Sequence, residues 1–222
     1  MRLFLLLMFL VLPSVANAKV VVDYIFDVKR KGSSIGTHRV TVNQTKDGEK
    51  VDVSIDLAVR FAGVTVYRYT HRSVELWTGG VLQKLDSTTD DDGRLFAVTG
   101  VRTAEGFSVT TADAAPVILG GTIVPTSYWN KAITSATTVL DSQDGTALKL
   151  SASPVPSSYS VNGREVAANL YQLRGSIPID LWYTQNGTWV GLRFERDGAA
   201  ITYFLKNNSQ LPELLDAQDV AR

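Results

Sequence analysis

Histidine is the usual proton carrier in catalysis, and the 222-residue sequence holds two of them, His38 and His71. Each lies inside a run of alternating apolar and polar residues, which places it in the middle of an expected β-strand. A serine hydrolase holds its histidine between a nucleophile and a carboxylate, usually from strand ends or loops. The sequence also lacks a Gly-x-Ser-x-Gly turn. It therefore predicts no catalytic residue.

The sequence also predicts no metal site and no cofactor. It contains no cysteine and no His-x-x-x-His pattern with which a helix could hold zinc. Asp90, Asp91 and Asp92 precede Gly93, but a calcium loop spaces its acidic ligands at alternate positions. Three adjacent aspartates before a glycine are more simply a hairpin turn.

The best candidate for a binding surface is the expected strand 64–77, whose odd-numbered residues share one face. A concave surface with the side chains of this face could hold a ligand, although an aromatic core layer would give the same pattern. The candidate ligand-binding residues on this strand are Tyr67, Tyr69, His71, Glu75 and Trp77. Four further candidates follow along the chain: Trp129, Asn130, Asp180 and Trp182.

Period-two alternation dominates the chain and indicates β-strands. In residues 20–28 every even position is apolar, and in residues 51–61 every odd position is apolar, as expected when one strand face is buried. The pattern breaks between Pro116 and Asp141, a segment expected to cover an end of the sheet. Within it, Thr126-Ser127 could cap a short helix through Asn130.

Alternation then resumes in five expected strands: 146–154, 165–174, 177–183, 189–196 and 199–205. Hairpin turns are expected at Asn162-Gly163, Asn186-Gly187 and Asp197-Gly198. The total is about eleven strands, and sheets longer than about ten strands curl or split. The expected fold is all-β: one strongly curved antiparallel meander sheet, a half-barrel or open barrel, with a short helical or irregular capping segment.

Residues 1–18 have the three parts of a secretory signal peptide: a basic start, a short apolar run and an Ala-x-Ala site. Cleavage after Ala18 predicts a periplasmic or secreted protein, with a single β domain over 19–208 and a C-terminal tail over 209–222. No later segment suits a membrane helix. The 22 basic and 22 acidic residues balance, so the chain lacks the concentrated positive charge that nucleic acid favours.

Several short motifs occur in a defined order: Glu75-x-Trp77-x-x-Gly80, Ser127-Tyr128-Trp129-Asn130, Asp180-Leu181-Trp182-Tyr183 and Tyr203-Phe204-Leu205. Over residues 22–206 the chain thereby resembles a family of exported bacterial β proteins that is described only as a domain of unknown function. The resemblance implies a periplasmic or secreted protein and supplies no catalytic residue. A looser likeness to periplasmic half-barrels that shuttle lipids or lipoproteins rests on architecture alone.

Three functions remain open from the sequence. The favoured one is a periplasmic binding module for a lipid or other amphiphile, because some strands are apolar on both faces, as at Leu181, Trp182 and Tyr183. The second is a structural or interaction protein of the cell envelope, whose protein partner is unknown. The third is an enzyme acting on envelope polymers, with Glu75, Asp180 or Glu195 as acid or base.

Overall fold

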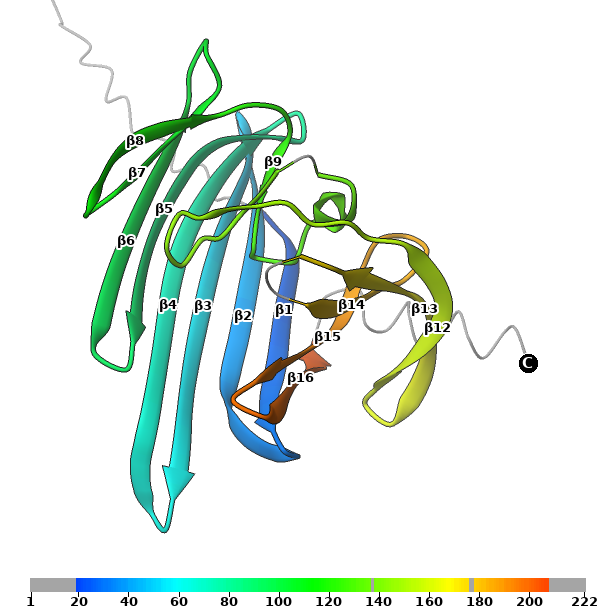
Figure 1. The fold of residues 1–222 in the computed structure, drawn as a ribbon. Helices are drawn as coiled ribbons and strands as arrows, with labels where there is room; N and C mark the ends of the chain where they lie inside the picture. The colour runs from blue at the N-terminus through cyan, green and yellow to red at the C-terminus, as the bar shows by residue number, and fades with distance from the viewer. Residues whose placement is uncertain (1–18, 137, 176–177, 208–222) are drawn as a thin grey trace, which may run out of the picture.

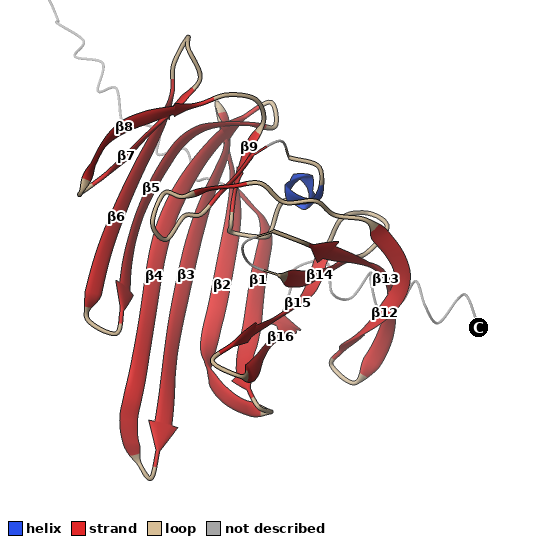
Figure 2. Ribbon diagram, viewed as in Figure 1, coloured by secondary structure: helices blue, strands red, loops and turns tan. Residues whose placement is uncertain are grey.

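The computed structural model of the protein describes residues 19–136, 138–175 and 178–207 (Figure 1). The expected signal peptide, residues 1–18, and the expected C-terminal tail, residues 209–222, lie outside the described residues. The described part is almost entirely β-structure, with one short 3₁₀ helix (Figure 2). No helix in this part is long and apolar enough to cross a membrane.

Thirteen strands form one antiparallel sheet, two more than the approximate number expected. In chain order they are β1 (Lys19–Arg30), β2 (Ser33–Thr45), β3 (Gly48–Phe61), β4 (Val64–Thr78), β5 (Val81–Asp91), β6 (Arg94–Arg102), β7 (Phe107–Thr111), β8 (Ala114–Leu119), β12 (Pro154–Val161), β13 (Arg164–Leu173), β14 (Ile179–Tyr183), β15 (Trp189–Arg196) and β16 (Ala199–Asn207). Their spatial order is β12-β13-β14-β15-β16-β1-β2-β3-β4-β5-β6-β7-β8. The first strand of the chain therefore lies in the middle of the sheet, and β8 and β12 are its edges.

The sheet is strongly curved and remains open, which confirms the expected half-barrel or open barrel (Figure 1). Its curvature brings distant strands together, since Arg196 on β15 forms an ion pair with Asp91 on β5. Six pairings separate these two strands in the sheet. A sheet of this length curls because each strand is twisted relative to the next.

The alternation in the sequence correctly predicts which strand faces are buried. On β1, Tyr24, Phe26 and Val28 are buried, and on β3 the buried residues are Val51, Val53 and Ile55. Phe61 was expected on the same buried face and is instead exposed, because β3 continues past the end of its neighbour β2. These buried faces form the concave side of the sheet.

Residues 120–153, here called the crossing segment, connect the two edges of the sheet across its concave face. They contain a three-stranded sheet of β9 (Ile123–Pro125), β10 (Thr138–Leu140) and β11 (Ala147–Leu148), and the 3₁₀ helix η1 (Lys131–Thr134). Ile123, Val124, Ile133 and Leu140 are buried against the concave face. The crossing segment therefore fills part of the interior rather than only an end of the sheet.

Two local expectations in this region are wrong. The helix does not follow a Thr126-Ser127 cap: Tyr128 has a φ of 62°, and η1 begins only at Lys131, with the Asn130 side chain accepting from the Ala132 N–H. The predicted strand 146–154 is reduced to the two residues of β11, and the next long strand, β12, starts at Pro154. The first error falls where no period-two pattern guided the prediction, whereas the alternation in residues 146–154 did not produce a long strand.

Candidate functional site

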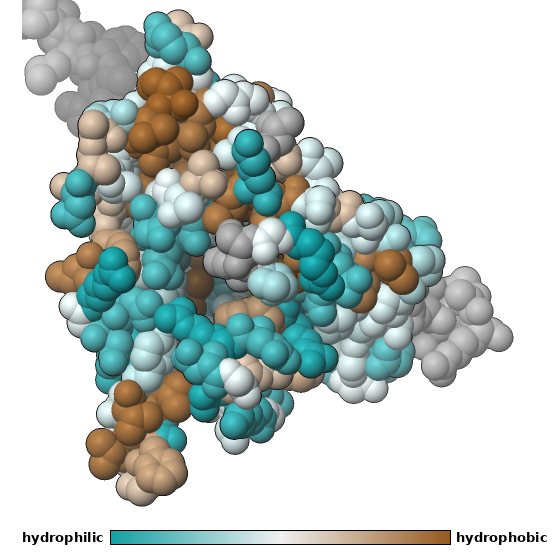
Figure 3. Space-filling view, viewed as in Figure 1, coloured by the Kyte–Doolittle hydropathy of each residue, from teal (hydrophilic) through white to brown (hydrophobic). Residues whose placement is uncertain are grey.

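A cavity of about 390 Å³ lies between the concave face of the sheet and the crossing segment. In Figure 3 the surface is hollowed near the centre of the view, with hydrophobic atoms visible inside. Apolar side chains from three parts of the chain form most of the cavity wall: Val53, Ile55 and Leu57 on β3; Ile133, Leu148 and Leu150 on the crossing segment; and Ile179, Phe194 and Ile201 on β14 to β16. The wall therefore depends on contacts between segments far apart in the sequence.

Polar side chains join the sheet to the crossing segment along one side of this cavity. The Tyr69 hydroxyl donates to Gln143 Oε1 at 3.2 Å. His71 Nε2 lies 3.4 Å from Ser142 Oγ, and His71 Nδ1 lies 2.8 Å from Thr89 Oγ1. Tyr69 and His71 also line the cavity. These bonds fix the crossing segment and leave an apolar cavity with a few polar groups.

Burial controls the charge of these polar groups. It lowers the pKa of His71 to about 4, and the nearby Arg72 acts in the same direction. His71 is therefore neutral at pH 7. Burial also raises the pKa of Asp141, a cavity residue on the crossing segment, and the charge of Asp144 adds to this rise. The inner part of the cavity thus disfavours charged ligand groups.

The mouth of the cavity has a different character. Of the residues that line the cavity, Val66, Arg196 and Asp197 are exposed and Arg30 and Tyr67 are partly exposed, which places polar side chains beside one valine at the opening. The Tyr67 hydroxyl donates to Asp91, which also accepts from Arg196 Nη2 at 3.2 Å. These three residues connect β4, β5 and β15 across the opening. A ligand with an apolar chain and a polar head group matches this division between interior and mouth.

The carboxyl group of Glu75 lies buried beside the cavity rather than in its wall. Its Oε2 accepts from Trp77 Nε1 at 2.8 Å and from Trp129 Nε1 at 3.1 Å. The two indole rings meet edge to face, with 5.7 Å between their centroids. Burial raises the pKa of Glu75, although the surrounding hydroxyl and indole groups lower it in part. This cluster holds the crossing segment on β4.

We expect Glu75→Gln to change the free energy of unfolding by less than about 1 kcal/mol, because an amide oxygen can still accept from both indoles. Glu75→Ala leaves two buried N–H groups without an acceptor, and we expect it to cost about 2–4 kcal/mol. Urea unfolding followed by tryptophan fluorescence measures both values. Equal losses for the two variants would contradict a hydrogen-bonding role and indicate that the negative charge itself is needed.

The remaining sequence candidates lie away from the cavity. Asn130 caps η1. Asp180 and Trp182 alternate along β14 with the buried Ile179 and Leu181, so they face the opposite side of the sheet. Asp180 pairs there with Arg174. Of the nine candidate ligand-binding residues, the structure places Tyr67, Tyr69 and His71 in the cavity wall.

The three carboxylates of the enzyme alternative do not converge. Glu75 is buried on the concave side of β4. Asp180 and Glu195 lie on the opposite face of β14 and β15, since Ile179 and Phe194 on the same strands line the cavity. The geometry therefore offers no carboxylate pair that includes Glu75.

The apolar residues on both faces of β14 have a packing explanation. The strand β12 curls over the outer face of β14 to β16, where the Tyr159 ring lies 4.8 Å from the Trp182 ring, measured between centroids. Tyr159 also donates to the Tyr203 carbonyl at 2.7 Å. A Cβ atom on Gly191 would lie 2.3 Å from the Tyr159 ring, so this position accommodates only glycine. The apolar residues on both faces of β14 are thus explained by a second packed layer of side chains rather than by a ligand groove.

The three adjacent aspartates form a hairpin turn, as the sequence predicted. Asp90 Oδ1 accepts from the Gly93 N–H at 2.7 Å, and Asp92 accepts from the Arg68 N–H. Asp91 bonds Tyr67 and Arg196 as described above. Within the described residues, no cluster of three or more histidine, cysteine or acidic side chains has the arrangement to hold a metal ion.

Sequence reasoning missed the cavity residues of the crossing segment, including Asp141, Ser142, Gln143 and Leu148. No period-two pattern was found before residue 146 of this segment, and its residues meet β4 only through the curvature of the whole sheet. The one available signal was the concentration of Gly, Pro and Ser/Thr after Leu119, which indicates a non-strand connection but not its destination.

Comparisons with known proteins identify a family whose model matches this chain and a solved structure with a similar fold. The model of the family described as "Domain of unknown function (DUF6134)" matches residues 26–206, which confirms the resemblance expected over residues 22–206. The chain is also similar to a crystal structure of a β-barrel-like protein of Domain of Unknown Function DUF1849 from Brucella abortus. The TM-score is 0.58 with 10% identity, over 86% of this chain and 98% of that chain. No curated protein sequence matches the chain.

Proposed function

The chain belongs to the family described as Domain of unknown function (DUF6134), and we propose that it is an exported binding protein for an apolar or amphiphilic ligand. The observation that carries the proposal is the cavity of about 390 Å³ under the crossing segment, with its apolar wall and polar mouth. Ligand cavities of proteins commonly measure about 300–1,000 Å³ and have a few polar groups that orient the ligand. The signal-peptide pattern of residues 1–18 supports export.

The size of the cavity favours a single hydrocarbon chain over a whole membrane lipid. Each methylene group transferred from water contributes about 0.8 kcal/mol, so ten of them contribute about 8 kcal/mol before the cost of immobilising the chain. This value of about 8 kcal/mol is an upper bound on the binding free energy, and it corresponds to a dissociation constant of about 1 μM. We therefore propose reversible binding, with the chain in the cavity and the head group near Arg30 and Arg196.

A fluorescent fatty acid is the first probe. We expect the mature protein to bind it with saturation, and Leu57→Trp to weaken binding at least tenfold because the indole fills space beside the cavity wall. Ser54→Trp is the matched control: it lies on the same strand but on the opposite face, so binding should be unchanged. Equal loss in both variants, or no uptake by the parent protein, would refute binding in the cavity.

Native mass spectrometry of protein purified from its own periplasm gives an independent answer. We expect a chain that starts at Lys19 and carries a bound small molecule. A ligand-free spectrum, together with no uptake of fatty acid, would leave the envelope-interaction alternative. A mass that includes residues 1–18 would refute export through a cleaved signal peptide.

A further inference from the structure

The hairpin of β3 and β4 projects beyond the rest of the sheet (Figure 1). β2 pairs with β3 no further than Leu57, and β5 pairs with β4 no further than Tyr69. Residues 58–67 therefore have their strand pairing only within the hairpin. Its turn is tight, because Ala62 and Gly63 both have positive φ, at 48° and 83°.

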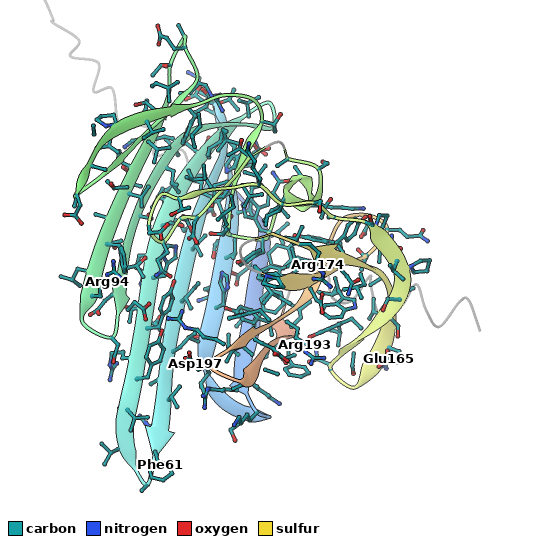
Figure 4. The ribbon with its side chains drawn as sticks, in the orientation of Figure 1. Phe61, Arg94, Glu165, Arg174, Arg193 and Asp197 are labelled. Carbon is teal, nitrogen blue, oxygen red and sulfur yellow. The ribbon has the colours of Figure 1, made fainter. Side chains whose placement is uncertain are left out.

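The free end of this hairpin is apolar. Phe61, Val64 and Val66 are 76%, 64% and 54% exposed, and residues 61–67 contain no charged side chain. Figure 4 shows Phe61 at the outermost point of the molecule in this view, and Figure 3 shows hydrophobic side chains gathered there. Single exposed apolar residues are common, but a group of them at the end of one hairpin indicates an interaction site. We call these three residues the hairpin tip.

Basic residues lie directly behind the hairpin tip. A recess of about 470 Å³ on this side is lined by Arg30, Lys31 and Arg60, together with two serines and four small or aliphatic residues. Within the described residues, none of the three cations forms an ion pair. The nearby Asp27 pairs instead with Lys29. The recess therefore presents three cations that have no ion-pair partner in the described part of the chain, next to an apolar end.

We propose that the hairpin tip docks on the surface of an anionic lipid bilayer. Phe61 and Val64 enter the boundary between head groups and acyl chains, and the cations of the recess contact the anionic head groups. An apolar end with arginine and lysine immediately behind it matches the order of layers at a membrane surface. The narrow, convex shape of the tip suits insertion between lipids better than it suits a flat protein interface.

Docking would also bring the cavity to the membrane. Val59, Val66 and Tyr67 lie on the hairpin and line the cavity, so apolar surface continues from the tip to the cavity mouth. A ligand could then pass between the bilayer and the cavity with little exposure to water. This transfer step rests on the proposed function, whereas docking itself does not.

Vesicle flotation tests docking directly. We expect the mature protein to float with vesicles of phosphatidylcholine and phosphatidylglycerol in equal parts. Phe61→Ser with Val64→Ser should weaken this binding about tenfold or more. The matched control is Val81→Ser with Val155→Ser, two residues that are each 46% exposed elsewhere on the sheet, and it should bind as the parent does.

The charge contribution is tested separately with Lys31→Glu and Arg60→Glu together. We expect about a tenfold loss on the anionic vesicles and no further loss on vesicles of phosphatidylcholine alone. Uptake of the fluorescent fatty acid from solution should be unchanged in the tip and charge variants, because Phe61, Val64, Lys31 and Arg60 do not line the cavity. Failure of docking and failure of ligand binding are therefore distinguishable.

Because the chain contains no cysteine, a single introduced cysteine can carry an environment-sensitive nitrobenzoxadiazole label. We expect a label at Phe61→Cys to shift its emission to the blue on anionic vesicles, and one at Val155→Cys to remain unshifted. A parent protein that does not float, or equal losses in the tip and control variants, would overturn the proposal. Concentration-dependent dimerisation that requires the tip, without flotation, would assign the tip to a second copy of this chain.

Discussion

Replacing Trp189 with alanine is expected to lower the free energy of unfolding by about 3–5 kcal/mol, the range for removing a fully buried large aromatic residue. Its ring lies 4.0 Å from Phe26 and 5.8 Å from Tyr128, between centroids. Its Nε1 donates to the Gly191 carbonyl at 2.9 Å. The residue therefore joins the middle of the sheet to the crossing segment.

Urea unfolding followed by circular dichroism measures this loss. Trp182→Ala is the matched control, since Trp182 is only partly buried on the outer face, and we expect it to cost less than half as much. If Tyr128 is anchored through Trp189, the fatty-acid affinity of Trp189→Ala should also fall, while that of Trp182→Ala should not. Equal destabilisation by the two variants would contradict the central position of Trp189.

The parts of the fold that followed from the sequence are those governed by local alternation. Strands β1 and β3 were identified correctly because residues 20–28 and 51–61 carry an unbroken period of two. β12 was missed because Pro154, Pro156 and three serines hide its pattern. β12 is held as a strand by its antiparallel pairing with β13. Tyr159 also packs on Gly191, 32 positions away along the chain, and no local pattern reports such a contact.

The candidate site was also predicted correctly only where local alternation determines the result. Tyr67, Tyr69 and His71 were found because they share one face of a strand, and that face proves to be concave. Asp180 and Trp182 also share a face, but the sequence does not tell which face of β14 is concave. The pairing of Glu75 with Trp129 depends on the path of the crossing segment, and 54 positions separate them. Periodicity thus gives the faces of strands, and the curvature of the sheet decides which faces meet.

Acid sensitivity is expected to depend on His38. It is fully buried among the rings of Phe26, Trp189 and Tyr203, and neither ring nitrogen has a hydrogen-bond partner among the described residues. Burial lowers the pKa of His38 to about 3, and the nearby His71 acts in the same direction. The native state therefore keeps this imidazole neutral under conditions in which an unfolded chain would protonate it.

The direction of the pH effect follows from proton uptake. Above pH 6.5, the ordinary pKa of histidine, neither state binds a proton at His38, so the residue contributes no pH dependence. Between pH 6.5 and about 3 only the unfolded state binds one, and stability falls by about 1.4 kcal/mol per pH unit. The pKa values of Glu75 and Asp141 are raised, so these groups bind protons more readily in the native state and oppose the fall.

We expect His38→Leu to be as stable as the parent or more so at pH 7, because it replaces an unpaired buried polar ring with an apolar group of similar volume. At pH 4.5 the variant should exceed the parent by a further 2–3 kcal/mol or so. Glu75 and Asp141 are common to both proteins, so their opposing effects cancel in the difference. Urea unfolding at pH 7, 6, 5 and 4.5 measures the gap, and parallel pH profiles would contradict a neutral His38 in the native state. Only two histidines are present, so their imidazole proton signals can also be followed by NMR, and neither should titrate between pH 8 and 5.5 while the protein stays folded.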